Sequence, residues 1–120
     1  DLGRLERDRL WLVDRKGDMI ITGGYNVYPS EVENVIAEVP GVREVAVIGV
    51  ADDDWGQRIV ALYTGTAERE DIDAHCEARL AAYKKPKEVL RRTGFPLNST
   101  GKIAKSVLRA EFTNQDVDGV

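Results

Sequence analysis

A lysine in a polar loop near the end of the chain is the residue best placed to do chemistry. Lys102 follows Gly101 in the sequence Asn-Ser-Thr-Gly-Lys-Ile. A lysine ammonium is a mobile point charge, suited to a phosphate or carboxylate oxygen whose charge changes during a reaction. The loop is not a Walker A motif, because Gly94 lies too far before Gly101 and Ile103 replaces the required Ser or Thr. A solvated turn lysine before a helix would look the same, so the motif alone leaves both interpretations open.

Three other segments carry groups that could line a nucleotide site. Residues 83–87, Tyr-Lys-Lys-Pro-Lys, could stack a base on the ring and bind phosphates through lysines. A basic helix C-terminus explains the same residues without a ligand. Gly23 and Gly24 would let the backbone approach a ligand closely, but they also suit an ordinary strand-to-helix loop. Trp55 follows an acidic turn, where it could line a groove or pack locally.

The chain offers little for metal or nucleophilic catalysis. His75 and Cys76 are adjacent on a predicted helix, so they point about 100° apart around its axis and form no ready dyad. With one His and one Cys in the chain, no metal site built on these ligands is expected. We interpret Cys76 as a core residue and His75 as a surface residue. Glu33 has the spacing from Ser30 that a helix capping box requires.

Composition predicts a single soluble globular domain. The 120 residues are 42% hydrophobic and 32% charged, and the net charge of −4 argues against a general nucleic-acid binder. No apolar run approaches the roughly 20 residues of a transmembrane helix. A single cysteine excludes an internal disulfide and fits a cytoplasmic location, or one peripheral to a membrane through a parent protein. The first residue is Asp rather than Met, so we expect an excerpt from a longer protein.

Hydrophobic patterning predicts an α+β fold in which strands and helices alternate. The expected strands and helices cover, in chain order, residues 10–13, 19–21, 29–39, 45–50, 59–63, 68–83, 89–90 and 103–112. The first two strands should form a hairpin around the polar residues 14–18, with Gly23-Gly24 ending the second. The prediction is therefore an N-terminal β-hairpin followed by a small, about three-stranded sheet covered by two or three helices. Residues 113–120 should be a flexible tail.

These segments together, and in this order, resemble the adenylate-forming superfamily. That superfamily comprises acyl- and aryl-CoA synthetases, firefly luciferase and the adenylation domains of peptide synthetases. The resemblance covers essentially residues 1–112, and the segments that carry it are residues 1–3, 14–21, 23–33, 40–42, 47–50, 55–56, 83–87 and 101–103. Each segment is weak alone, but their ordered coincidence is specific. The sequence Gly-Gly-Tyr-Asn-Val-Tyr-Pro is more similar to that of fatty acyl- and aryl-CoA synthetases than to that of peptide-synthetase domains.

The resemblance implies that residues 1–112 are the mobile C-terminal subdomain of an ATP-dependent fatty acyl-CoA synthetase. In such enzymes a carboxylate attacks the α-phosphate of ATP, giving acyl-adenylate and pyrophosphate, and the thiol of coenzyme A then displaces AMP. The implied partner is a large N-terminal adenylation domain, which would hold most of the ATP, Mg²⁺ and fatty acid sites. The C-terminal domain rotates between the two steps. The fragment alone should therefore fold but show little or no ligase turnover.

The same resemblance assigns roles to individual residues. Lys102 matches the catalytic adenylation lysine, Asp1 and Arg15 match residues at the ATP ribose, and Gly17 occupies the hinge, where Asp or Lys is usual. The positions that match a coenzyme A site are Gly23, Gly24, Tyr25, Trp55, Tyr83, Lys85 and Lys87. The pair Arg91-Arg92 is more basic than the residues usually found at these positions in the family.

Two other interpretations stay open at this point. The chain could be the equivalent piece of another adenylating enzyme, such as a peptide synthetase or a luciferase-like protein. It could also be a non-enzymatic module that binds coenzyme A or a partner protein. The acyl chain length is not encoded here, because the residues that would measure it lie elsewhere.

Overall fold

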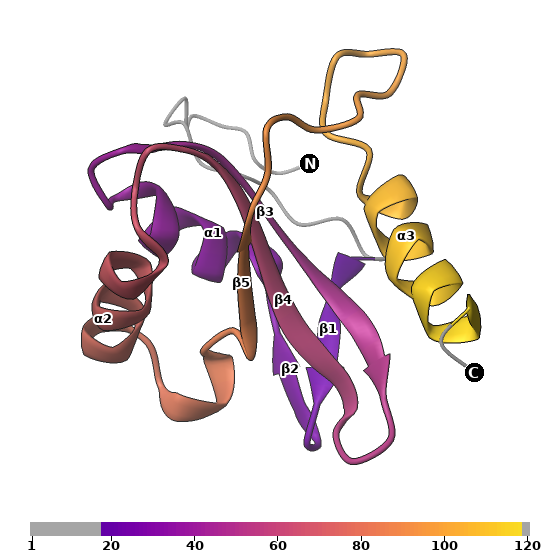
Figure 1. Cartoon of the computed structure of the whole chain (residues 1–120). Helices are drawn as coiled ribbons and strands as arrows, with labels where there is room; N and C mark the ends of the chain where they lie inside the picture. Colours follow the sequence, from indigo (N-terminus) through magenta and orange to yellow (C-terminus); the bar gives the residue numbers. More distant parts are fainter. Residues whose placement is uncertain (1–17, 119–120) are drawn as a thin grey trace.

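The computed structural model describes residues 18–118, with side chains as far as Phe112. Its fold is α+β, as the sequence predicts: a two-stranded hairpin, a three-stranded sheet and three α-helices (Figure 1). The strands are β1 (Ile20–Thr22), β2 (Tyr25–Val27), β3 (Val42–Asp52), β4 (Gly56–Gly65) and β5 (Glu88–Arg91). The helices are α1 (Pro29–Ala37), α2 (Arg69–Arg79) and α3 (Lys105–Asp118), with a 3₁₀ helix over Ala82–Lys84.

The three-stranded sheet is the middle layer of the domain. Its order is β3-β4-β5, with β4 antiparallel to β3 and parallel to β5. On one face, Val47 and Ile59 pack with apolar residues of α1 and α2, such as Ile36 and Ile72. On the other face, Ala46, Ile48 and Val50 pack against Leu108 of α3. Figure 1 shows α3 on the opposite side of the sheet from α1 and α2. The expected strand over residues 45–50 is thus buried on both faces, as its nearly unbroken apolar run predicts.

The described hairpin is formed by a different pair of segments from the predicted one. Residues 20–22 pair with the segment that follows Gly23-Gly24, so that Ile20 faces Val27 and Thr22 faces Tyr25. Gly23 and Gly24 both have positive φ, 59° and 86°, which tight two-residue hairpin turns require and glycine adopts without strain. The glycine pair is therefore the turn of the hairpin and does not simply end a strand. The expected strand over residues 10–13 lies outside the described residues.

The predicted capping box at the start of α1 is wrong. The helix begins at Pro29, and the residue at the N-cap is Tyr28, which makes no side-chain capping bond. Glu33 therefore lies in the second turn of the helix, where its side chain is buried and accepts a hydrogen bond from the backbone nitrogen of Val47 at 2.8 Å. The apolar stripe predicted for this helix does face the core, with Ile36 fully buried.

The helix predicted over residues 68–83 ends early. Ile72, Cys76 and Leu80 face the core as expected, but Leu80 is already extended, with φ −118° and ψ 146°. The chain then forms the separate 3₁₀ helix, which turns the ring of Tyr83 away from the core and leaves it 39% exposed. Lys85 is extended because it precedes Pro86, whose ring disfavours helical geometry in the residue before it.

The last helix is displaced towards the C-terminus. Ile103 pairs with Leu97 in an isolated β-bridge, so α3 begins only at Lys105. It continues past Phe112 to Asp118, which makes most of the segment expected as a tail helical; its flexibility stays a prediction. None of the described helices has the length and apolar character needed to cross a membrane.

The single cysteine is a core residue, as predicted. Cys76 is 2% exposed among apolar residues of α2 and the sheet. Burial raises the pKa of its thiol from 9.0 to about 11, and the nearby Asp73 carboxylate acts in the same direction. The neighbouring His75 is partly exposed and bonds Glu38.

The buried thiol predicts low reactivity and a specific pH dependence. We expect the native chain to resist iodoacetamide at pH 7, and to react once it is unfolded, because only the thiolate is nucleophilic. The raised pKa also stabilises the fold below pH 9.0, and this contribution should be lost progressively as the pH rises from 9.0 to about 11. Urea unfolding across this pH range would measure the loss. In Cys76→Ala the same titration should be absent, and an equal alkaline loss in that variant would contradict the assignment.

Candidate functional site

The catalytic candidate Lys102 lies in a loop between β5 and α3 that is held by its own hydrogen bonds. The side-chain oxygen of Asn98 accepts bonds from the backbone nitrogens of Thr100, at 2.9 Å, and Lys102, at 3.1 Å. The backbone nitrogen of Asn98 donates to the carbonyl oxygen of Lys102 at 2.8 Å, and Gly101 takes a positive φ of 86°. The backbone is therefore fixed while the Lys102 side chain is exposed to solvent. Asn98 was not among the residues predicted from sequence to matter at this site, although asparagine is a frequent organiser of such turns.

A stacked aromatic pair forms part of a second group of predicted site residues. The rings of Tyr25, on β2, and Tyr83, on the 3₁₀ helix, lie with centroids 4.2 Å apart and planes inclined by 21°. They remain 54% and 39% exposed, so the stack presents a flat apolar surface to solvent. A bidentate contact supports the 3₁₀ helix from α1: the ammonium of Lys84 lies 3.0 and 2.9 Å from the two carboxylate oxygens of Glu31. This hydrogen bond raises the pKa of Lys84.

Trp55 lies against the hairpin turn, close to the same group. The backbone nitrogen of Gly23 donates to the carbonyl oxygen of Trp55 at 2.8 Å, and a Cβ atom at Gly23 would lie 3.0 Å from the indole Cε3. Asp52 orders the preceding turn, because its carboxylate accepts a bond from the backbone nitrogen of Trp55 at 3.0 Å. The ammonium of Lys87 lies 4.4 Å from the centroid of the indole ring. A glycine at position 23 is thus needed both for its positive φ and for the close approach of Trp55.

The lysines of the basic segment have separate partners. Lys87 contacts Trp55, whereas Lys84 pairs with Glu31 and Lys85 pairs with Glu77 of α2. The structure therefore brings Lys87, but not Lys85, to the aromatic group. We call the assembled set the hairpin-end group; its members are Gly23, Gly24, Tyr25, Trp55, Tyr83 and Lys87.

The hairpin-end group and Lys102 lie at opposite ends of the sheet. In Figure 1 the β1–β2 turn, the β3–β4 turn and the 3₁₀ helix gather at the lower end, whereas the loop between β5 and α3 projects at the upper end. Asp1, Arg15 and Gly17, the other residues singled out by the resemblance, lie outside the described residues.

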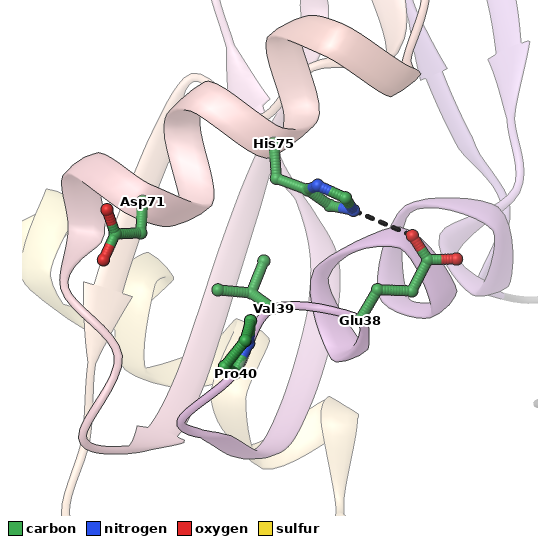
Figure 2. Close-up of a pocket in the computed structure, with 5 residues that line it drawn as sticks. All are labelled: Glu38, Val39, Pro40, Asp71 and His75. Atoms are coloured by element: carbon green, nitrogen blue, oxygen red, sulfur yellow. Dashed lines mark hydrogen bonds and ion pairs between the residues drawn. The ribbon is translucent and has the colours of Figure 1, made fainter.

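A hollow between α1 and α2 contains none of the predicted site residues. It is lined by Glu38, Val39, Pro40, Asp71 and His75 (Figure 2). The carboxylate of Glu38 accepts bonds from His75 at 2.8 Å and Arg79 at 3.0 Å, and the bond from His75 is the main cause of its lowered pKa. These contacts link two helices. Among the side chains that the structure describes, residues 18–112, no cluster of three or more His, Cys, Asp and Glu is arranged to hold a metal ion.

The chain belongs to the family of AMP-binding enzyme C-terminal domains, whose family model matches residues 31–102. The recognition of this chain as the C-terminal domain of an adenylate-forming enzyme is thereby confirmed. A related protein is the long-chain-fatty-acid–CoA ligase FadD13 of Mycobacterium tuberculosis, 46% identical over 117 residues, a match that covers 94% of this chain and 23% of the ligase. The 2-succinylbenzoate–CoA ligase of Listeria monocytogenes is 40% identical over 112 residues, 91% of this chain and 24% of that enzyme.

Solved structures of similar proteins show the same fold. The chain matches a Mycobacterium tuberculosis fatty acyl CoA synthetase with a TM-score of 0.80 and 48% identity, covering 85% of this chain and 21% of that one. It matches apo MatB from Rhodopseudomonas palustris with a TM-score of 0.79 and 38% identity, covering 83% of this chain and 21% of MatB. The chain therefore spans less than a quarter of the length of these relatives.

Proposed function

We propose that this chain is the C-terminal domain of an ATP-dependent acid–CoA ligase and serves its two half-reactions with its two ends. The observation that carries the proposal is the separation of Lys102 from the hairpin-end group by the length of the sheet. Two chemically distinct groups on one rigid domain can each enter the same active site if the domain rotates between steps. The partner is a large N-terminal domain, and the family membership and the length of the relatives both support it.

In the first half-reaction Lys102 would stabilise charge. A carboxylate oxygen attacks the α-phosphorus of ATP, the bond to the β-phosphate oxygen breaks, and acyl-adenylate and pyrophosphate form. Two anions must meet, so an ammonium placed between them lowers the barrier most in the transition state. The exposed Lys102 on its hydrogen-bonded loop suits that role, and the exposed Leu97 beside it suits contact with a larger domain. Asp1 and Arg15 at the ribose and Gly17 at the hinge belong to the same proposal.

In the second half-reaction the hairpin-end group would bind coenzyme A. The thiol attacks the acyl carbon of the adenylate, AMP leaves, and the thioester forms. The Gly23-Gly24 turn has no side chains that would obstruct a thiol-bearing arm, and the exposed ring of Tyr83 can stack on an adenine. Lys87 supplies a nearby positive charge for phosphates. Lys85, which pairs with Glu77, would reach a phosphate only by leaving that partner.

The proposed acid is a fatty acid, and the proposed site of Mg²⁺ is the N-terminal domain. The long-chain-fatty-acid–CoA ligase and the 2-succinylbenzoate–CoA ligase are both relatives, and the higher identity of the first favours a fatty acid. Mg²⁺ would accompany the ATP phosphates, where it neutralises their charge. A cytoplasmic location and the inactivity of the isolated domain are parts of the same proposal.

The full-length protein, meaning this chain with its large N-terminal domain, provides the test. We expect fatty-acid-dependent exchange of pyrophosphate into ATP, followed by a fatty acyl-CoA product, across a panel that includes 2-succinylbenzoate. The 120-residue chain alone should support neither reaction. Exchange without any coenzyme A product would favour another adenylating enzyme. No exchange with any acid would refute the ligase proposal.

A further inference from the structure

An ion pair with a buried carboxylate holds the start of the helix that follows the Lys102 loop. Lys105 is the first residue of α3, and its ammonium lies 2.7 Å from the Oε2 atom of Glu33 on α1. The same oxygen accepts the bond from the backbone nitrogen of Val47, on the edge strand β3. Because α1 and α3 cover opposite faces of the sheet, this ion pair connects the two layers at the β3 edge.

The burial of Glu33 makes this contact different from an ordinary surface salt bridge, and Lys105 is itself partly buried. The Glu33 and Lys105 side chains are 4% and 19% exposed. A buried carboxylate that lost its cation would keep the cost of leaving water without the compensating attraction. The contact between the Lys105 ammonium and Glu33 is therefore costly to break. Lys105 lies three residues beyond Lys102, so the end of the loop is fixed along with it.

The beginning of the same loop is also attached to α3. The guanidinium of Arg92 donates to the carbonyl oxygen of Gly94 at 3.0 Å and to the carboxylate of Glu111 at 2.9 Å. These contacts give a structural reason for the basic Arg92, whose presence the sequence alone did not explain. Both ends of the loop are thus bound to α3. The helix α3 is bound to the rest of the domain through Glu33, through the packing of Leu108 on the sheet and through an ion pair between Arg109 and Asp18 at 3.1 Å.

We propose that the Glu33–Lys105 ion pair positions Lys102 for adenylate formation. In this proposal the two residues act through the loop and not on the substrate itself. They hold the first residue of α3, which directly follows the loop, and so they help to set where the Lys102 ammonium lies when the domain docks. The inference rests on the proposed role of Lys102, and its test therefore includes a measurement that does not depend on catalysis.

The first measurement is hydrogen exchange of loop residues 96–103 in the full-length protein. We expect Lys105→Met to accelerate this exchange about tenfold, because local opening of the loop becomes easier. Lys105→Arg should retain the wild-type rate. A matched control is Lys84→Met, which removes the ion pair between Lys84, a lysine with a side chain 23% exposed, and Glu31 of α1. This control should leave the exchange rate of loop residues 96–103 unchanged. Unchanged loop exchange in Lys105→Met would overturn the proposal.

The second measurement separates positioning from charge balance. Glu33→Gln/Lys105→Met removes both charges while the Gln oxygen can still accept the Val47 bond, so this variant should fold even if Lys105→Met does not. If the ion pair positions the loop, the double variant should show fast loop exchange and adenylate formation reduced roughly tenfold or more, with thioester formation from supplied acyl-adenylate spared. Wild-type exchange and activity in the double variant would show that only charge balance mattered, and would overturn the proposal.

A comparison with Lys102→Ala distinguishes the two ways of failing. If the double variant loosens the loop but adenylates normally while Lys102→Ala does not, Lys102 is catalytic and the positioning inference is wrong. If both variants adenylate normally, the proposed role of Lys102 is wrong, and the inference falls with it.

Discussion

In the full-length protein, Lys102→Ala is expected to reduce adenylate formation roughly hundredfold or more, since it removes a preorganised charge from the reacting anions. Acid-dependent exchange of pyrophosphate into ATP measures this half-reaction. Thioester formation from supplied acyl-adenylate and coenzyme A should be spared. The reason is geometric: with the hairpin-end group facing the active site, the Lys102 loop lies at the far end of the sheet.

Lys87→Ala is the matched comparison for Lys102→Ala, because it removes one ammonium from the opposite end of the same domain. It should weaken the use of coenzyme A and leave pyrophosphate exchange near the wild-type rate. Equal losses in both half-reactions for Lys102→Ala would contradict the assigned role. They would indicate that the substitution disturbs domain docking or folding rather than a charge needed in one step.

The elements that were predicted well depend on neighbours in the sequence. The apolar run over residues 45–50 needs no distant information, because a strand covered on both faces is apolar throughout. The early end of α2 could not be predicted in the same way. Tyr83 continues the helical periodicity of Leu80, but its ring stacks on Tyr25, a residue far away in the sequence. Tertiary contact decides between the two arrangements, and periodicity does not report it.

In the candidate site, too, local features were predictable from the sequence and contacts between distant residues were not. A Gly-Lys pair in a polar loop made Lys102 a candidate, because turn chemistry is local, and the family resemblance supplied its proposed role. The surroundings of Lys102 were not predictable, since Glu33 has the spacing of a capping residue and its actual partners, Val47 and Lys105, are distant in the chain. The basic segment shows the same limit. Its lysines look equivalent in sequence, yet Lys85 and Lys87 have different partners in the fold.

The second large effect is expected at the hairpin turn. Gly24→Leu in the full-length protein should lower thioester formation roughly tenfold or more while pyrophosphate exchange is retained. A Cβ atom at Gly24 meets nothing within 4 Å, so an added side chain would project outward, into the space proposed for the arm of coenzyme A. The assay is conversion of supplied acyl-adenylate to acyl-CoA, with the coenzyme A concentration varied to separate binding from turnover.

Backbone strain must be separated from obstruction in this experiment, because φ at Gly24 is +86° and a non-glycine residue there costs about 1–2 kcal/mol. Asparagine tolerates positive φ better than leucine and is smaller, so Gly24→Asn should retain more thioester formation than Gly24→Leu. Gly23 would be a poor choice for this comparison, since a side chain there would press on Trp55 and deform the turn directly. Wild-type coenzyme A turnover in a folded Gly24→Leu protein would remove the hairpin turn from the proposed thioester-forming face. Loss of both half-reactions together would point instead to a turn that no longer forms. A leucine side chain that only blocks the arm of coenzyme A should affect thioester formation alone, because that is the step in which the turn faces the active site.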